Sequence, residues 1–549
     1  MNKELSPTER FLSLFTTLRA GEGFPALLLA AQAFAIMFSL YLLKVIRDTL
    51  ILSQGDAELK AYATAIQAGL LIFIVPIFAR LYFYLSPRSG KHLILCCVLQ
   101  FFLFSLLLFA VLYWQGVSIA VVFYIWQGLF AVMSLAVFWA FAADLFNPRS
   151  GQRLFPLIAA AGALGALLGA ASAAPLNTLS GHVGVLCAAA LLLLVPLTLS
   201  GRMEEAIPTG SLAGSHEAPV SPGSLAEGFS IVLRSRYLSA IAALVVLLNL
   251  INTNGEFVVA SLLTDELARQ GLDSTQSPER AQRITGFYAT YQSITALLGL
   301  LIQLFLVSRV FDRFGIRGAL LVLPIVTLLG YGLLSLLPLL MLALIVLIAE
   351  NSISYSLTAT TRHALFLPVS REQKYIGKQT IETLFFRLGD MISGGLVYVA
   401  SSLLGFSTLV FMLGNLVLSV ILLGFAIAIG RYHYRIILKK MNNLPPVLAS
   451  PISDLRIDSG RLTEFVFNTE TFGDPDEGDA LRYTAYLNDS EPLPPWIEFD
   501  GLQRKFSFNP GSNDGGRIQL RVVARDFQGL STESRFDVHV APVNGRITD

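Results

Sequence analysis

Twelve long apolar segments run along this chain, and each is long enough to cross a lipid bilayer as a helix. A helix of about 20 residues spans a hydrocarbon core about 30 Å thick. Six of the segments precede a polar stretch that begins near residue 203, and six follow it. The expected spans are 25–51, 61–85, 92–114, 118–146, 153–175, 182–200, 237–263, 285–308, 316–338, 339–361, 373–403 and 406–430.

The composition is typical of a polytopic membrane protein. Of the 549 residues, 54% are hydrophobic and 14% are charged, and the mean hydropathy is +0.64. The sequence contains no P-loop, no phosphorylated-Asp pump motif, and no Ser/His/Asp, Cys/His or metal-hydrolase arrangement. We therefore expect no enzyme activity, no cofactor in the membrane part and no nucleic-acid binding, with the lipid bilayer as the main partner.

Lysine and arginine residues lie almost entirely at alternate ends of these spans. They precede the first span and follow the even-numbered ones, whereas the opposite loops are poor in them, apart from 264–284. By the positive-inside rule these basic ends face the cytoplasm, so both termini are expected there, as in a bacterial inner-membrane protein. The basic residues are Lys3, Arg10, Arg19, Arg88, Lys91, Arg149, Arg153, Arg202, Arg234, Arg236, Arg309, Arg313, Arg317, Arg371, Lys374, Lys378, Arg431, Arg435, Lys439 and Lys440.

The arrangement of six spans plus six is typical of the major facilitator architecture, in which two parallel repeats form the halves of a transporter. Between the eighth and ninth spans, the segment Asp312-Arg313-Phe314-Gly315-Ile316-Arg317-Gly318 is similar to the facilitator loop signature. In that signature an acid, a tight glycine turn and basic residues join neighbouring helices. An ordinary basic turn is the alternative, and the equivalent loop 80–91 of the first half keeps the charge but little of the pattern.

The expected organisation has four parts. Residues 1–200 form the first six-helix half, and residues 237–440 form the second. Between them lies a cytoplasmic linker, 201–236, whose first part is rich in Gly, Ser and Pro and should be flexible. The amphipathic segment 224–236 predicts a short helix at the membrane interface. Residues 441–549 form a separate domain.

The sequence changes character after the last span. Pro445-Pro446 and Pro451 exclude a continuing helix, and short alternating runs follow, separated by Gly, Asp and Pro turns. Examples are 481–486, 518–524 and 536–540. The tail is therefore expected to be an all-β sandwich of the immunoglobulin or cadherin kind, with binding of a protein partner as its default role.

Three ionisable residues lie near the end of the first span, in Lys44-Val45-Ile46-Arg47-Asp48. They share one helical face, and Lys44 is spaced to pair with Asp48 at i, i+4. Ionisable residues within a span usually face a cavity or a partner, which makes this face a candidate anion site. The alternative is the outer end of the helix, with the basic side chains snorkelling to the interface.

The seventh span carries Asn249, Asn252, Asn254 and Glu256 around Gly255, which is expected to loosen the helix. Polar residues beside a break in a helix expose backbone to substrate in transporters. Hydrogen bonding between helices is the alternative, and it would account for the Asn residues better than for Glu256. Glu256 is therefore the candidate coupling or gating carboxylate.

The fifth span contains Gly162, Gly165 and Gly169, a face of small residues. Such a face predicts close packing against another helix, and we assign it no chemistry.

The tenth and eleventh spans are the most charged. Helical spacing predicts the pairs Lys378–Glu382 at i, i+4 and Arg387–Asp390 at i, i+3. These pairs leave Arg362 without an obvious local partner, and arginine favours bidentate contacts to phosphate or carboxylate. The alternative places Arg362 at the cytoplasmic interface, facing lipid headgroups.

Most of residues 20–430 resembles a known family, the nucleotide transporters of the ATP/ADP translocase type found in plastids and intracellular bacteria. The matching segments follow the order and spacing of the family. They are Arg47-Asp48-Thr49, Phe138-Trp139-Ala140-Phe141-Ala142, Arg153-Leu154-Phe155-Pro156-Leu157, Asn252 to Glu256, Tyr355-Ser356-Leu357, Leu367-Pro368, Gly377-Lys378 and Arg387 to Gly395.

The resemblance implies exchange or uptake of a nucleotide or related organic anion by alternating access. By position it makes Glu256 and Arg362 substrate-site or coupling residues. The chain differs where the family has a Lys-Glu pair after a Phe-Asp-Pro step, because here Arg362-His363 follows Ala359-Thr360-Thr361. The resemblance thus implies an anion carrier without fixing ATP and ADP as its substrates. The candidate substrate residues are Lys44, Arg47, Asp48, Asn252, Glu256, Tyr355, Arg362, Lys378 and Arg387.

The tail resembles the cadherin-like domains of the dystroglycan type over almost its whole length. The matching segments are Asp474-Pro475-Asp476-Glu477-Gly478-Asp479, Leu481-Arg482-Tyr483, Leu493-Pro494-Pro495-Trp496-Ile497, Phe499-Asp500 and Ala524-Arg525-Asp526. Such domains are usually extracytoplasmic. The basic segment 431–440 nevertheless predicts a cytoplasmic tail, because basic residues directly after a span are costly to translocate.

Four carboxylates of the tail, at Asp474, Asp476, Asp479 and Asp526, have the oxygen chemistry of a Ca²⁺ site. The geometry of turns accounts for the same residues without a metal.

Three functions follow from the sequence. The leading hypothesis is a secondary transporter of a nucleotide or another small organic anion. The second is a membrane receptor or scaffold in which the spans only anchor the tail, although an anchor has no use for Lys44, Glu256 and Arg362. The third is a flippase for a lipid or lipid-linked precursor, which a side opening between helices would favour.

Overall fold

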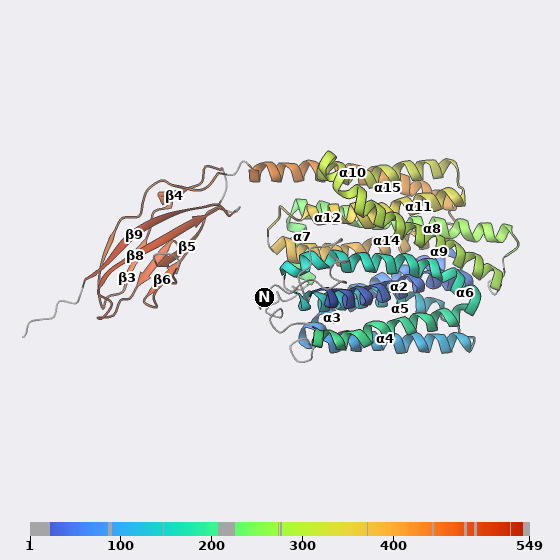
Figure 1. The fold of residues 1–549 in the computed structure, drawn as a ribbon. Helices are drawn as coiled ribbons and strands as arrows, with labels where there is room; N and C mark the ends of the chain where they lie inside the picture. The colour runs from blue at the N-terminus through green and yellow to red at the C-terminus, as the bar shows by residue number, and fades with distance from the viewer. Residues whose placement is uncertain are drawn as a thin grey trace, which may run out of the picture. The chain divides into compact units, whose positions relative to one another are not determined.

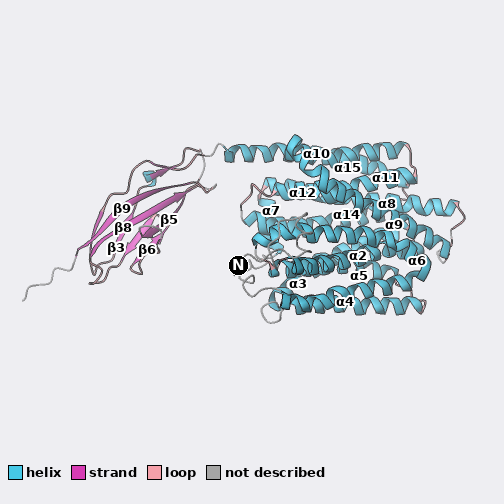
Figure 2. Cartoon of the chain, in the orientation of Figure 1, coloured by secondary structure: helices cyan, strands magenta, loops and turns pink. Residues whose placement is uncertain are grey.

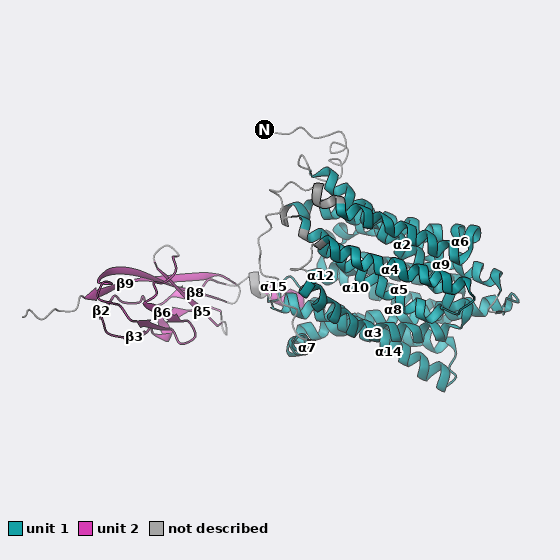
Figure 3. Ribbon diagram, turned by 90° about the horizontal axis from the view of Figure 1, so that it is seen from below, with its two compact units in different colours: residues 1–432 teal, residues 433–549 magenta. Residues whose placement is uncertain are grey.

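The chain forms two compact units, residues 1–432 and 433–549 (Figure 3). The computed structural model describes residues 22–85, 91–146, 148–206, 225–272, 274, 277–370, 372–441, 444–476, 480–487, 491–526 and 529–541. Half of the expected linker, residues 207–224, lies outside these ranges, as do Lys3, Arg10, Arg19, Arg88, Arg371 and Asp479.

The first unit is a bundle of long helices (Figures 1 and 2). Large apolar side chains such as Phe73, Phe104 and Leu329 are more than half exposed on it, at 67%, 67% and 68%. Helices that are apolar all round are typical of membrane spans. The first half contains α2 (Gly23–Gln54), α3 (Ala57–Leu85), α4 (Lys91–Trp114), α5 (Ala120–Leu145) and α6 (Pro148–Ala206).

The second half begins after α7 (Leu225–Arg234), which forms where the sequence predicted a short amphipathic helix. Several of its helices contain short π-helical turns, labelled η. Its elements are α8 (Arg236–Arg269), α9 (Pro278–Leu301), η1 (Ile302–Leu306), α10 (Val307–Leu336), α11 (Leu340–Ile353), η2 (Ser354–Thr358), α12 (Ala359–Leu365), η3 (Gln373–Gly377), α13 (Lys378–Thr380), η4 (Ile381–Phe385), α14 (Phe386–Val397), η5 (Tyr398–Leu403) and α15 (Thr408–Met441).

Ten helical segments of the described residues are long and apolar enough to cross a membrane. Two of them are long enough for two crossings each, Arg153–Gly201 with 49 residues and Pro278–Leu336 with 59. Each of the two is kinked at a glycine with positive φ, Gly181 at 63° and Gly315 at 64°. Glycine adopts this conformation readily because it has no Cβ. The unit is therefore an integral membrane bundle with the twelve crossings that the sequence predicted.

The fifth crossing packs tightly on the first. A Cβ on Gly165 would lie 2.3 Å from the carbonyl oxygen of Phe34, and a Cβ on Gly169 would lie 2.3 Å from that of Phe38. The backbones of α6 and α2 therefore approach each other directly, and the close packing predicted from the glycine face is confirmed.

The loop between the eighth and ninth crossings has the tight glycine turn and a basic contact of the facilitator signature. Its tight turn is at Gly315, and Nε of Arg317 donates to the carbonyl oxygen of Gly430 in α15, 3.2 Å away. The basic residue thus joins neighbouring helices of the second half, as the signature requires.

The seventh crossing runs without a break through Gly255, so the predicted loosening of this helix is wrong. The glycine provides space instead, because a Cβ there would lie 2.1 Å from the hydroxyl of Tyr331. An α-helix can include a glycine at modest cost when a neighbouring side chain needs its room.

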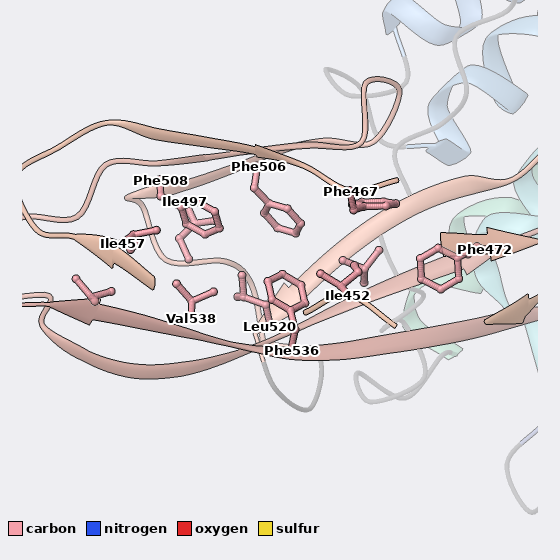
Figure 4. Close-up of a cluster of buried hydrophobic side chains, with 13 residues drawn as sticks. Ile452, Ile457, Phe467, Phe472, Ile497, Phe506, Phe508, Leu520, Phe536 and Val538 are labelled. Carbon is pink, nitrogen blue, oxygen red and sulfur yellow. The ribbon is translucent and has the colours of Figure 1, made fainter. Parts of the chain in front are cut away.

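The second unit is a β-sandwich with strands in the orders β2-β9-β8-β5 and β3-β7-β6, and a short pair β1-β4. Alternate side chains enter one core between the sheets, where Phe506, Phe508 and Leu520 are completely buried (Figure 4). The runs predicted from the sequence correspond to β5, β8 and β9. The strands are β1 (Val447–Leu448), β2 (Leu455–Asp458), β3 (Thr463–Val466), β4 (Phe472–Gly473), β5 (Arg482–Leu487), β6 (Ile497–Asp500), β7 (Lys505–Phe508), β8 (Gly516–Arg525) and β9 (Ser531–Ala541).

Candidate functional site

A buried lysine of the first half lies between two carboxylates that come from opposite halves of the bundle. The Nζ atom of Lys60 in α3 is 3.3 Å from Oδ1 of Asp48 in α2 and 3.5 Å from Oε2 of Glu256 in α8. It also donates to the hydroxyl of Tyr288 in α9, 3.2 Å away. Lys60 is only 3% exposed, so its charge depends on these partners. We call Lys60, Asp48, Glu256 and Tyr288 the Lys60 cluster.

Arg47 extends the Lys60 cluster within the first half. Its Nη2 atom is 3.1 Å from Oδ1 of Asp48, and its Nη1 atom donates to Oε1 of Gln127, also 3.1 Å away. The guanidinium carbon lies 4.2 Å from the centroid of the Tyr124 ring, in a cation–π contact. Two cations therefore meet Asp48 directly.

Lys44 does not form the predicted pair with Asp48. Its Nζ atom lies 5.6 Å from the ring centroid of Tyr41 and 5.9 Å from that of Tyr355, which belongs to the second half. Within the described part of the chain, no carboxylate is at ion-pair distance from Lys44, because Arg47 and Lys60 pair with Asp48 instead. Tyr355 is 52% exposed. Lys44 is thus a half-buried cation with two aromatic rings beside it.

The two halves also meet through further hydrogen bonds near the same helix ends. The hydroxyls of Thr49 in α2 and Thr285 in α9 are 3.1 Å apart, and Asn177 in α6 donates to Thr285 over 3.3 Å. Nη2 of Arg280 donates to the carbonyl oxygen of Leu52, 3.3 Å away. These contacts join the halves on the side of the bundle where α2 ends and α3 begins.

A cavity of about 120 Å³ lies between the halves, between α3 and α5 on one side and η4 and α14 on the other. Its polar lining consists of Glu382, Thr383 and Arg387, and the rest of the lining is apolar. The candidate residue Arg387 therefore faces a space between the halves.

Arg387 forms the predicted i, i+3 pair with Asp390, with 3.5 Å between Nη1 and Oδ2. Oδ1 of Asp390 also accepts hydrogen bonds from Asn249 and Thr253 in α8, both 2.7 Å away. This polar group holds α8 and α14 together inside the second half.

The asparagines of the seventh crossing bond to neighbouring helices. Asn252 donates to Oδ1 of Asn351 over 3.1 Å, and Asn351 donates to the hydroxyl of Tyr291 over 2.8 Å. Asn254 donates to Oδ1 of Asn415 over 3.3 Å. The alternative of hydrogen bonding between helices thus accounts for these residues, whereas Glu256 belongs to the Lys60 cluster.

Arg362 and Lys378 lie apart from the Lys60 cluster. The predicted pair between Lys378 and Glu382 is wrong: among the described residues, Glu382 pairs with His363, with 3.4 Å between Oε1 and Nδ1. The physical reason is that η3 and η4 are π-helical and shift side chains out of α-helical register. Nε of Arg362 is buried and has no hydrogen-bond partner in the described part of the chain. Arg362 lies three residues before the end of α12 at Leu365.

Lys60, the central residue of the cluster, is not among the site residues predicted from the sequence. The predicted second span begins at residue 61, whereas α3 begins at Ala57. An acidic start, Asp56-Ala57-Glu58 after Gly55, is a typical signal for a helix N-terminus and would have placed Lys60 inside the span.

Asp474 and Asp526, two of the tail residues proposed for Ca²⁺, serve turns, whereas Oδ2 of Asp476 accepts from the backbone N–H of Leu444 over 2.8 Å. Oδ1 of Asp474 accepts from the backbone N–H of Asp476 over 2.9 Å, and Oδ1 of Asp526 accepts from Gly529 and Leu530 over 2.6 and 2.9 Å. The described residues contain no group of three or more His, Cys, Asp and Glu side chains placed to hold a metal ion. Asp479, the fourth candidate, lies outside the described residues.

The two units are similar to different known proteins. The family model He_PIG, described as "Putative Ig domain", matches residues 445–541. No curated protein matches the sequence.

Solved structures match the membrane unit. A bacterial homologue of the human lysosomal transporter Spinster, in an inward-facing and unoccupied conformation, is 12% identical with a TM-score of 0.52, covering 76% of this chain and 99% of its own. The nucleoside transporter NupG is 13% identical with a TM-score of 0.52, covering 74% and 99%. The POT family transporter PepTSo is 14% identical with a TM-score of 0.51, covering 76% and 99%. The membrane unit has a major facilitator-like fold. At these identities the likeness concerns the fold alone, and the Ig-like match agrees with the β-sandwich of the tail.

Proposed function

We propose that this protein is a secondary transporter that moves a small organic anion by alternating access of its two halves. We further propose that the anion is a nucleotide or a related phosphate-bearing molecule, carried without chemical conversion. The observation that carries the proposal is Lys44, a half-buried cation with rings of both halves beside it and no carboxylate partner among the described residues.

The charges around Lys44 favour an anion. Lys60 and Arg47 are balanced by Asp48 and Glu256, and Lys44 adds a positive charge that these four groups do not offset. A cation within a membrane span is costly unless a partner or substrate neutralises it. An anionic substrate supplies that partner.

The two tyrosines extend the argument to the shape of the substrate. Tyr41 and Tyr355 offer aromatic rings beside the cation, and Tyr355 is 52% exposed. An aromatic face stacks on planar bases without requiring one base in particular. A phosphate-bearing molecule with a planar ring fits both features, and the resemblance to nucleotide transporters supports the same class.

The Lys60 cluster is proposed to hold the halves together in one state of the cycle. Its central cation belongs to the first half, and its partners Glu256 and Tyr288 belong to the second. Opening the bundle on this side must break these contacts, so the substrate has to compensate for their loss.

For the membrane orientation, we propose that the basic helix ends face the cytoplasm, with both termini there. Twelve crossings place the ends of the membrane unit on one side, and the positive-inside rule selects that side. The tail would then be cytoplasmic, available to a protein partner.

The test is uptake of labelled ATP, ADP and other nucleotides into proteoliposomes containing the full chain, its Lys44→Ala variant or its Lys374→Ala variant. Lys374 is exposed and serves as the matched control. Uptake that depends on Lys44, that Lys374→Ala retains and that internal unlabelled nucleotide accelerates is the expected result. An Arg362→Ala variant decides whether that residue touches substrate or faces headgroups.

Absence of uptake for every nucleotide would reject the nucleotide assignment and direct the search to other phosphorylated metabolites and lipids. A chain that transports none of these, yet folds and binds a protein through its tail, would be the receptor or scaffold.

A further inference from the structure

Glu350 in α11 is a buried carboxyl group whose hydrogen-bond partners are all neutral. It is 2% exposed, and its Oε2 atom accepts from the hydroxyl of Tyr331 in α10 over 2.9 Å. The side chain of Asn252 in α8 also hydrogen-bonds to it. No lysine, arginine or histidine of the described residues lies at ion-pair distance from this carboxyl.

Asp48, Glu256 and Asp390, by contrast, have cations beside them. Asp48 meets Arg47 and Lys60, and Glu256 meets Lys60. Asp390 meets Arg387. Glu350 is therefore the exception in this part of the bundle, and burying an isolated carboxylate is far more costly than burying a carboxylic acid.

The groups that face Glu350 from the neighbouring helices do not supply a positive charge. Asn252 of α8 and Tyr331 of α10 hydrogen-bond to it, and the titratable groups that interact with it electrostatically are Glu256 of α8, Tyr291 of α9 and Tyr355 of η2. Glu256 is the one charged group among them, and its negative charge opposes ionisation of Glu350. A charge on Glu350 would therefore have no cation of the described residues beside it to balance it.

The packing of α8 leaves room for the hydrogen bond between Tyr331 and Glu350. A Cβ on Gly255 would lie 2.1 Å from the Tyr331 hydroxyl that donates to Glu350. Asn252, which touches the carboxyl, is one helical turn before Glu256 in the Lys60 cluster. The protonation state of Glu350 can therefore act on the inter-half contact through α8.

We propose that Glu350 is a proton-binding site that couples transport to a proton gradient, an inference that rests on the proposed transport function. The carboxylate takes up one proton from water on one side of the membrane and becomes a neutral acid. In the alternate state it releases the same proton to the other side. Glu256, with Lys60 beside it, then belongs to the contact between the halves and not to the proton path.

The first test needs no substrate. Infrared difference spectra of the full chain in nanodiscs should contain the C=O band of a protonated buried carboxyl at neutral pH, and Glu350→Gln should lose it. Glu372→Gln, at an exposed carboxyl, should retain it. Absence of the band in the unmodified protein, or its persistence in Glu350→Gln, would overturn the proposal. Asn252→Ala gives a second variant, expected to shift the band, should Glu350→Gln fail to fold.

The second test separates coupling from transport. Proteoliposomes receive labelled ADP under a pH gradient, with potassium and valinomycin holding the membrane potential at zero. One coupled proton drives about tenfold accumulation for each pH unit. Glu350→Gln should lose this accumulation and keep exchange against internal ADP.

The outcomes distinguish the two proposals. Exchange without any gradient-driven accumulation in the unmodified protein, or accumulation that survives in Glu350→Gln, rejects proton coupling at Glu350 and leaves transport standing. If the unmodified protein shows neither exchange nor accumulation, ADP transport is rejected, and the infrared band then decides the proton site by itself.

Discussion

The Nζ atom of Lys60 and the Oε2 atom of Glu256 lie 3.5 Å apart across the boundary between the two halves of the membrane unit. Lys60 also meets Asp48 of its own half, so one buried cation serves a carboxylate on each side of the boundary. Such a group stabilises the joined state only while all its members are present, because each charge left alone in the interior is unfavourable.

Replacing Lys60 by Met should therefore destabilise the bundle. Removing one partner of a buried ion pair costs about 3–5 kcal/mol, because the remaining charges are left without compensation. Thermal unfolding of the purified protein in detergent measures the effect, with Lys374→Met as the exposed control. The double variant Lys60→Met, Glu256→Gln should recover part of the loss, and an unchanged melting temperature in the single variant would contradict the arrangement.

Gly165 should tolerate no side chain, because its α-carbon faces the carbonyl oxygen of Phe34. A Cβ would lie 2.3 Å from that oxygen, so Gly165→Val must push α6 away from α2. Overpacking of this kind typically costs about 1–3 kcal/mol. Gly414→Ala in α15 is the control, because nothing lies within 4 Å of the Cβ position there. Yield and melting temperature in detergent should fall for the first variant and stay level for the second.

The fold could be predicted because it depends on patterns that can be read directly from the amino-acid sequence. Segment length and hydropathy gave the twelve crossings, and the kinks at Gly181 and Gly315 lie in the expected breaks. The tail was predictable in the same way, because alternation and turn residues identify strands such as β8 and β9.

The site was predictable only in part, because several of its ion pairs join residues of different helices. Helical spacing correctly gave Arg387–Asp390, which lies in regular α-helix. It failed for Lys44–Asp48, because Lys60 reaches Asp48 from another helix, and for Lys378–Glu382, because π-helical turns change the register. The cation-free surroundings of Glu350 come from α8 and α10, so no local pattern could reveal them.

The β-sandwich should fold when produced without the membrane unit, because it has a core of its own. A fragment of residues 444–541 is expected to unfold cooperatively in urea. Phe506 is fully buried in this core, so Phe506→Ala should cost about 3–5 kcal/mol, whereas Leu502→Ala at a 98% exposed position should change little. A fragment that lacks a cooperative transition would show that the core needs the rest of the chain.

The same fragment should lose stability in acid through Asp537. The hydrogen bond from Arg517 on the neighbouring strand lowers the pKa of Asp537 below its ordinary value of 3.8. Because the pKa is lower in the folded state, this contribution is complete above the ordinary value. It is lost as the pH falls through the folded-state pKa. Arg517→Met should flatten this part of the pH profile of unfolding, and Arg461→Met, at an exposed arginine, should not.

Variants of Tyr355 should show whether the substrate has a planar ring. Its exposed ring lies 5.9 Å from Lys44, so a molecule whose phosphate meets Lys44 can stack its ring on Tyr355. Base stacking on an aromatic side chain is worth about 1–3 kcal/mol, so Tyr355→Ala should weaken binding of ADP about 5- to 150-fold. Tyr355→Phe keeps the ring and should bind ADP nearly as well. Binding of ribose 5-phosphate, which has no base, should be equally weak for all three proteins. Equal losses for ADP and ribose 5-phosphate in Tyr355→Ala would mean that the ring positions Lys44 and does not touch a base.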